Sequence, residues 1–137
     1  MAASRRFMLD TNIASFIVRG ANAALQSKLR AHPIADTCIS SITEGELLFG
    51  LAKRPEATAL KTAVHELLKL VNVLPWDSSA AAAYGVLRAT LERQGTPLGN
   101  LDTLIAAHAI ATRSVLVTND KALVRTPGLQ AKDWSTV

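Results

Sequence analysis

Short apolar runs alternate along this chain with longer segments in which apolar residues recur every three or four positions. The short runs have the length of buried strands, and the longer segments have the spacing of amphipathic helices. We predict strands at residues 6–9, 36–40, 71–76, 114–120 and 129–134. We predict helices at 23–32, 41–54, 57–71, 78–95 and 101–113, and a shorter helical turn before Gly20.

This alternation of elements predicts an α/β fold. Strands separated by helices pair in parallel, and the helices cover both faces of the sheet that results. We therefore expect a three-layer α/β/α sandwich around a short parallel sheet of about four to five strands. No internal repeat or long linker divides the sequence, so residues 1–137 are expected to form a single domain.

The composition is that of a globular protein, with 49% apolar and 19% charged residues. The single cysteine, Cys38, excludes an internal disulfide, fits a reducing compartment and is expected to pack inside a strand. The first residues lack the apolar core of a signal peptide, and no apolar run approaches the roughly 18 residues of a membrane span. We expect a cytoplasmic protein with no membrane segment.

The net charge of +4 and the pI of about 9.6 favour a polyanionic partner such as nucleic acid. Aromatic residues make up only 4% of the chain, which leaves little material for base stacking. Contact through backbone phosphates suits this composition better.

Two acidic residues stand where predicted strands end. Asp10 follows the apolar run of 6–9, and Asp120 follows the apolar run that starts at residue 115. In an open parallel sheet, ligands bind beyond the carboxyl ends of the strands. If these two strands are neighbours, the two carboxylates converge.

Two further acids lie on core-facing helix positions. Glu44 shares a helical face with the leucines at 47, 48 and 51, whereas Glu46 faces the other way and is interpreted as solvated. Asp102 opens the helix of 101–113 on its apolar side. Each acid also has an ordinary explanation: turn and N-cap chemistry for Asp10 and Asp120, a capping box with Ser41 for Glu44, and the helix dipole for Asp102.

Four converging carboxylates repel one another and require a counter-charge. Oxygen ligands of this kind select Mg²⁺ or Mn²⁺. The chain has no zinc-type cluster, because its histidines lie far apart at 32, 65 and 108, and His108 is interpreted as a packing or surface residue. No glycine-rich phosphate loop or nucleophile elbow is present. An acidic metal site in a basic protein predicts hydrolysis of phosphodiesters.

Five blocks of the sequence, in order, resemble the PIN-domain ribonucleases and specifically the VapC toxins of type II toxin–antitoxin systems. The blocks are FMLDTNIASFIV, ISSITEGELLFGLAK, AAAAYGVLRATLERQGTPLGNLDTLIAAHAIA, LVTND and GLQAKDW, spread over roughly residues 6–134. The resemblance implies a PIN fold and a Mg²⁺- or Mn²⁺-dependent endoribonuclease. It implies that the site consists of Asp10, Glu44, Asp102 and Asp120.

The same resemblance implies a cognate VapB-type antitoxin and a homodimer. The PLGNLDTLIAAHA run is similar to VapC toxins that cut initiator tRNA in the anticodon loop, so tRNA is the expected substrate. Thr11 and Thr118 are expected to orient the neighbouring carboxylates. Candidate phosphate contacts are Lys121, Arg125, Arg88 and Arg93.

Three other classes of protein share parts of this pattern. A receiver domain shares the size, the alternation and the Mg²⁺ site, but Asp77 is its only candidate phosphate acceptor here. A binding module could use the acids for helix capping and bind RNA without cutting it. A haloacid-dehalogenase-like phosphatase needs a second aspartate two residues after Asp10, where Asn12 stands.

Overall fold

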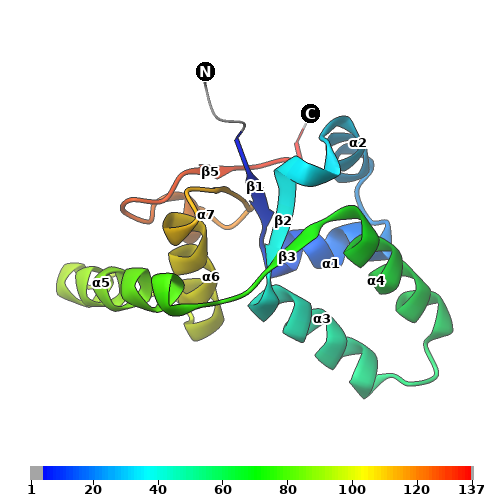
Figure 1. Cartoon of the computed structure of the whole chain (residues 1–137), viewed down its shortest axis with the longest axis horizontal. Helices are drawn as coiled ribbons and strands as arrows, with labels where there is room; N and C mark the ends of the chain where they lie inside the picture. Colours follow the sequence, from blue (N-terminus) through cyan, green and yellow to red (C-terminus); the bar gives the residue numbers. More distant parts are fainter. Residues whose placement is uncertain (1–4, 137) are drawn as a thin grey trace.

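A computed structural model describes residues 5–136 of the chain. Five short strands form one sheet in which every neighbouring pair is parallel, in the order β3-β2-β1-β4-β5 (Figure 1). The strands are β1 (Phe7–Leu9), β2 (Thr37–Ser40), β3 (Asn72–Leu74), β4 (Val115–Val117) and β5 (Ala131–Lys132). The predicted parallel α/β sheet is confirmed; β1 and β2 are one residue shorter than predicted, and the other three strands are at most half the predicted length.

Helices connect the strands, as the pattern predicts. They are α1 (Thr11–Arg19), α2 (Ala23–Ala31), the 3-10 turn η1 (Ile34–Asp36), α3 (Ser41–Lys53), α4 (Thr58–Leu70), α5 (Ser78–Gln94), α6 (Asn100–Ala111) and α7 (Lys121–Val124). The sequence did not predict η1 or α7, because segments of three and four residues show no periodicity. No helix within the described residues is long and apolar enough to cross a bilayer.

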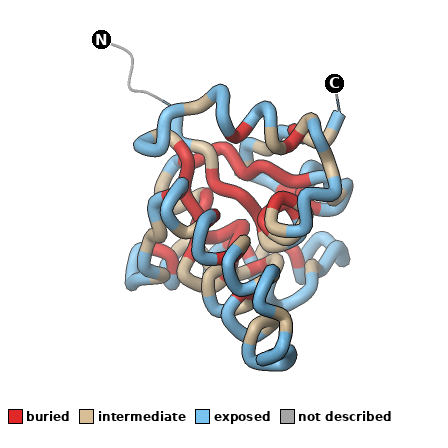
Figure 2. The backbone as a smooth tube through the Cα atoms, turned by 90° about the vertical axis from the view of Figure 1, so that its right-hand side faces the viewer, coloured by how far each residue is buried: buried red, intermediate tan, exposed pale blue. Residues whose placement is uncertain are grey.

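Side chains alternate between the two faces of the sheet and build a core on each. Leu9, Ile39 and Val117 point to the face covered by α1, α2 and α4. Met8 and Leu116, one position earlier on β1 and β4, join Cys38 on the opposite face, where α5, α6 and α7 pack. The buried strands run through the middle of the molecule between exposed helical surfaces (Figure 2). The three-layer sandwich is therefore confirmed, and Cys38 lies inside a strand as expected.

A buried hydrogen bond between Ser40 and His108 joins the end of β2 to α6. The Ser40 hydroxyl accepts from the Ile42 N–H at 3.1 Å, which makes Ser40, and not Ser41, the N-cap of α3. The same oxygen lies 2.8 Å from Nδ1 of His108 on α6. Because Ser40 caps the helix, Glu44 is not three residues after the cap, and the capping-box explanation for it is wrong. His108 is a packing residue, as the sequence suggested.

An aromatic cluster closes one end of the sheet. Trp134 stacks on His32 with ring centroids 4.6 Å apart, and its centroid lies 5.2 Å from that of Phe7 at the start of β1. The indole is 2% exposed although it lies after the last strand. This cluster therefore joins the end of the chain to α2 and to the central strand.

Replacing Trp134 with alanine is expected to lower the free energy of unfolding by about 3–5 kcal/mol, because a fully buried aromatic side chain leaves a cavity. Chemical denaturation monitored by circular dichroism measures this change. Phe49, which is 56% exposed on α3, is the matched control. Phe49→Ala is expected to cost less than about 1 kcal/mol, and equal losses in the two variants would contradict a structural role for the cluster.

Candidate active site

The order of the strands brings distant acids to one edge of the sheet. Because β1 pairs in parallel with β4, the residues that follow both strands lie side by side. The Asp10 N–H donates to the Val117 carbonyl at 3.0 Å and extends this pairing by one residue. Chain order reverses between β1 and β4, which is where open α/β sheets form their binding crevices.

Asp10 is both a helix cap and a buried carboxylate. Its Oδ1 accepts from the Ile13 N–H at 2.8 Å, so Asp10 is the N-cap of α1. The residue is only 3% exposed. Capping satisfies one lone pair of a carboxylate that is otherwise costly to bury. The ordinary explanation for Asp10 is thus correct, and it leaves the charge of the group uncompensated.

Burial, together with smaller contributions from repulsion by Asp102 and Asp120, raises the pKa of Asp10 to about 6. Hydrogen bonding from the Thr118 hydroxyl and the Ile13 N–H opposes these effects but does not cancel them. The pKa of Asp102 is also raised, first by burial and then by the charge of Asp120. Three carboxylates from separate segments therefore interact electrostatically, as expected from their positions in the sequence.

Asp102 precedes β4 along the chain and Asp120 follows it. Asp102 lies half-buried in the first turn of α6, and Asp120 caps α7 by accepting from the Ala122 N–H at 2.9 Å. Thr118 connects the group, because its Oγ1 accepts from the Asp120 N–H at 3.0 Å while it also bonds to Asp10. The interactions of Thr118 support the positioning role expected for it.

Thr11 does not make the expected contact with a carboxylate. Its hydroxyl lies 3.2 Å from Oγ1 of Thr43 in the first turn of α3. This contact places the Thr43 face of α3 beside the start of α1, next to Asp10. Any acid that α3 contributes to the site should therefore share the face of Thr43.

Glu46 meets that condition better than Glu44. Residues three and four positions apart share a helix face, so Glu46 and Leu47 lie on the side of Thr43. Glu46 is half-buried and lines a pocket together with Thr11. The interpretation of Glu46 as a solvated residue is therefore wrong. The sequence could not show this, because the choice of Glu44 depended on Leu48, which is 42% exposed.

The donor set suits a hard divalent cation without forming a closed cage. Within residues 5–136, no group of three or more His, Cys, Asp or Glu side chains is arranged to hold a metal ion by itself. Mg²⁺ is usually held by one or two carboxylates, with waters and substrate phosphates completing its shell. Carboxylates that already repel one another, such as those of Asp10 and Asp102, fit that mode of binding.

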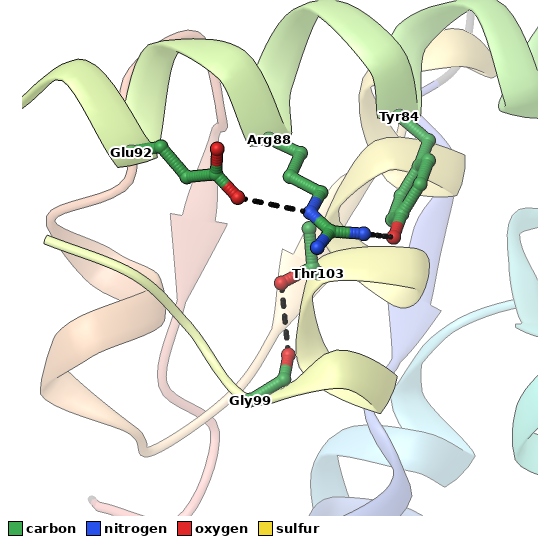
Figure 3. Close-up of polar contacts among 5 residues, drawn as sticks. All are labelled: Tyr84, Arg88, Glu92, Gly99 and Thr103. Carbon is green, nitrogen blue, oxygen red and sulfur yellow. Dashed lines mark hydrogen bonds and ion pairs between the residues drawn. The ribbon is translucent and has the colours of Figure 1, made fainter.

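The four candidate phosphate contacts differ in availability. Lys121 and Arg125 are exposed on and just after α7, the helix that Asp120 caps. Arg88 is instead engaged within α5: it donates to the Tyr84 hydroxyl at 2.9 Å and pairs with Glu92 at 3.2 Å (Figure 3). Arg93 is exposed and lies 3.4 Å from Oγ1 of Thr90. Lys121 and Arg125 are the better placed pair.

The receiver and phosphatase alternatives find no support in the geometry. Asp77 follows β3, which is an edge strand, and its Oδ1 accepts from the Ala80 N–H as the N-cap of α5. A receiver requires its acceptor aspartate after a central strand, and here that place belongs to Asp10. Asn12, where a phosphatase needs its second aspartate, is an exposed residue of α1.

Known proteins share this arrangement over almost the whole chain. The PIN domain family model matches residues 7–129. A protein from Shigella flexneri named tRNA(fMet)-specific endonuclease VapC is 35% identical over 131 residues, which cover 95% of this chain and 98% of that protein.

Solved structures agree with the sequence match. The crystal structure of DNA-bound VapBC from Salmonella typhimurium has a chain with a TM-score of 0.88 and 35% identity, covering 95% of this chain and 98% of that one. VapBC2 from Rickettsia felis, bound to a DNA fragment from its promoter, gives a TM-score of 0.85 at 31% identity, with 93% and 98% covered. The fold, the edge at which the acids meet and these matches together show that the chain belongs to the PIN-domain family and, within it, to the VapC ribonucleases.

Proposed function

We propose that this protein is the toxin of a VapBC-type toxin–antitoxin system and hydrolyses phosphodiester bonds of RNA with Mg²⁺ or Mn²⁺. The observation that carries the proposal is the convergence of Asp10, Asp102 and Asp120 at the carboxyl edge of the sheet. Burial, together with repulsion among these carboxylates, raises the pKa of Asp10 and Asp102, which is unfavourable for folding. An energetically costly cluster in a crevice is typical of a functional site.

Each acidic residue has a distinct part in the proposed site. Asp10 uses one oxygen to cap α1, and this fixed orientation holds the carboxylate at the switch point between β1 and β4. The Thr118 hydroxyl bonds to both the Asp10 carboxylate and the backbone N–H of Asp120, which fixes their relative positions. Asp102 approaches from α6, and Glu46, favoured over Glu44, approaches from α3. A divalent cation bound there would activate water and stabilise the negative charge that develops on the phosphate.

The substrate and partners of the relatives suggest those of this chain. Relatives at 35% identity are named tRNA(fMet)-specific endonucleases, which favours initiator tRNA, cut in its anticodon loop, as the substrate. The solved neighbours are VapBC complexes, which favours inhibition by a VapB-type antitoxin. We also infer a homodimer and a cytoplasmic location, consistent with a substrate that is itself cytoplasmic.

The purified protein is expected to cleave initiator tRNA within its anticodon loop in the presence of Mg²⁺ or Mn²⁺ and to stop when EDTA is added. Gel analysis of end-labelled initiator and elongator methionine tRNA measures both the site and the selectivity. Equal cutting of the two tRNAs would be consistent with nuclease activity but would contradict specificity for initiator tRNA. Cutting that continues in EDTA would overturn the metal mechanism.

Asp10→Asn is expected to reduce cleavage more than about 100-fold, because the site loses a metal-binding charge at its centre. Asparagine still accepts the Ile13 N–H, so the cap of α1 survives. The same variant is expected to be more stable than the parent protein when both are free of metal at pH 7. Calorimetry with EDTA present measures the difference.

The sign of this stability change follows from the raised pKa. The folded protein binds a proton at Asp10 more tightly than the unfolded chain does, so this group destabilises the fold as the pH rises from about 4 to about 6. At pH 7 the cost is at most about 3 kcal/mol. At pH 4 the two proteins are expected to be nearly equal in stability. A variant that is less stable at pH 7 would show that Asp10 is a structural residue.

Glu46→Gln and Glu44→Gln form a matched pair that identifies the acid contributed by α3. Both residues are half-buried, and the substitutions remove the same charge. Glu46→Gln is expected to lower cleavage at least about tenfold, and Glu44→Gln less than about twofold. Initial rates at saturating Mg²⁺ measure the effect. A larger loss of cleavage in Glu44→Gln than in Glu46→Gln would show that Glu44 is the acid that α3 contributes.

A further inference from the structure

A pocket of about 310 Å³ is lined by residues of α1, α3 and α4. These helices lie on the side of the molecule away from α5 and α6 (Figure 1). The floor of the pocket is apolar, and it includes Leu47 and Val64 from the core. Three cationic side chains line it, against one carboxylate. They are Arg19, Lys53 and Arg54, and the carboxylate is Glu46.

No carboxylate within the described part of the chain forms an ion pair with any of these cations. Within residues 5–136, the ion pairs are Lys69 with Glu66 and Arg88 with Glu92, and neither contains a cation of the pocket. Arg19 is held in place because its Nη2 donates to the Ser15 hydroxyl at 2.8 Å. Lys53 lies over the Phe49 ring, with Nζ 4.7 Å from the centroid. The pocket thus presents oriented positive charge that remains free to bind an anion.

The pocket adjoins the proposed active site. Thr11, the residue after Asp10, and Glu46 both line it. An RNA strand with a phosphate at the acidic cluster carries another negative charge at each neighbouring nucleotide. The carboxylates of the cluster repel those charges. The rest of the strand is therefore bound favourably only where it lies on a cationic surface.

We propose that this pocket, with Arg19, Lys53 and Arg54, binds the backbone phosphates of the RNA next to the cleaved bond. The proposal rests on the proposed nuclease function and adds the path that the substrate takes. The size of the pocket is within the range of sites that hold small ligands, which is large enough for part of a nucleotide. The position of the pocket beside Asp10, through Thr11 and Glu46, favours the backbone of the RNA that is cut there over an unrelated acidic peptide.

Two of the pocket cations also have a simpler explanation, which is stabilisation of the helices that carry them. Arg19 and Lys53 lie in the last turns of α1 and α3, where positive charge stabilises the helix dipole. Such a role predicts lower thermal stability after substitution and no change in RNA affinity. Lys28 and Arg30, in the last turn of α2, are exposed and do not line the pocket. They provide a matched control.

The test compares Lys53→Gln/Arg54→Gln with Lys28→Gln/Arg30→Gln, each in the full chain and each removing two charges. Binding is measured with the cleavage-deficient Asp10→Asn background and initiator tRNA, by fluorescence anisotropy over a range of salt concentrations. The pocket pair is expected to weaken binding roughly tenfold at low salt and to reduce the slope of log affinity against log salt by about 0.7 for each lost phosphate contact. The control pair is expected to change both values much less.

The two double substitutions are also made in the protein that retains Asp10, and RNA cleavage is measured. This experiment distinguishes the pocket proposal from the proposed nuclease function. If the parent protein cuts RNA and the pocket pair raises KM more than it lowers kcat, the phosphate path is supported. If the parent cuts RNA but the two pairs have equal affinity, salt slope and KM, the pocket proposal is overturned while the nuclease stands. Loss of binding to an oligo-glutamate peptide, with RNA binding intact, would assign the pocket to a protein partner and also overturn the proposal. A parent protein that cuts no RNA would instead overturn the proposed function.

Discussion

The parallel pairing of β1 with β4 is the interaction on which the site depends. Three residues of backbone pairing, from Phe7 with Val115 to Leu9 with Val117, bring together two segments that are more than a hundred positions apart. The next residues, Asp10 and Thr118, inherit this register and meet at the edge of the sheet. A slip of one residue would exchange the faces of β1 and remove Asp10 from its neighbours. The core therefore determines the geometry of the acids.

Much of this arrangement could be predicted from the sequence, because the relevant signals are local. The apolar runs identified the strands, and the parallel topology followed from the helices between them. Asp10 and Asp120 could be assigned to one edge because both follow strands. The acid on α3 could not be chosen by apolar periodicity, since Leu48 and Phe49 on that helix are exposed. The contact between Thr11 and Thr43 decides which face of α3 meets the site, and tertiary packing alone creates it.

The helix caps show why a structural and a functional explanation of the same residue need not compete. Asp10 and Asp120 both accept a backbone N–H at the start of a helix, as their local sequences predict. An asparagine or serine would cap as well and would carry no charge into the sheet edge. What the capping role does not explain is the carboxylate itself, with a pKa raised by burial and by two neighbouring acids.

The burial of His108 against Ser40 affects the uptake and release of protons when the chain folds. Burial lowers the pKa of His108, against the opposing influence of Asp77 and the Pro75 carbonyl, so folding favours the neutral form of its ring. In mildly acidic solution the unfolded chain holds a proton on this histidine that the folded protein releases. Asp10 behaves in the opposite way and takes a proton up on folding. The two groups therefore have opposite effects on how stability changes with pH, and they offset each other wherever their titration ranges overlap.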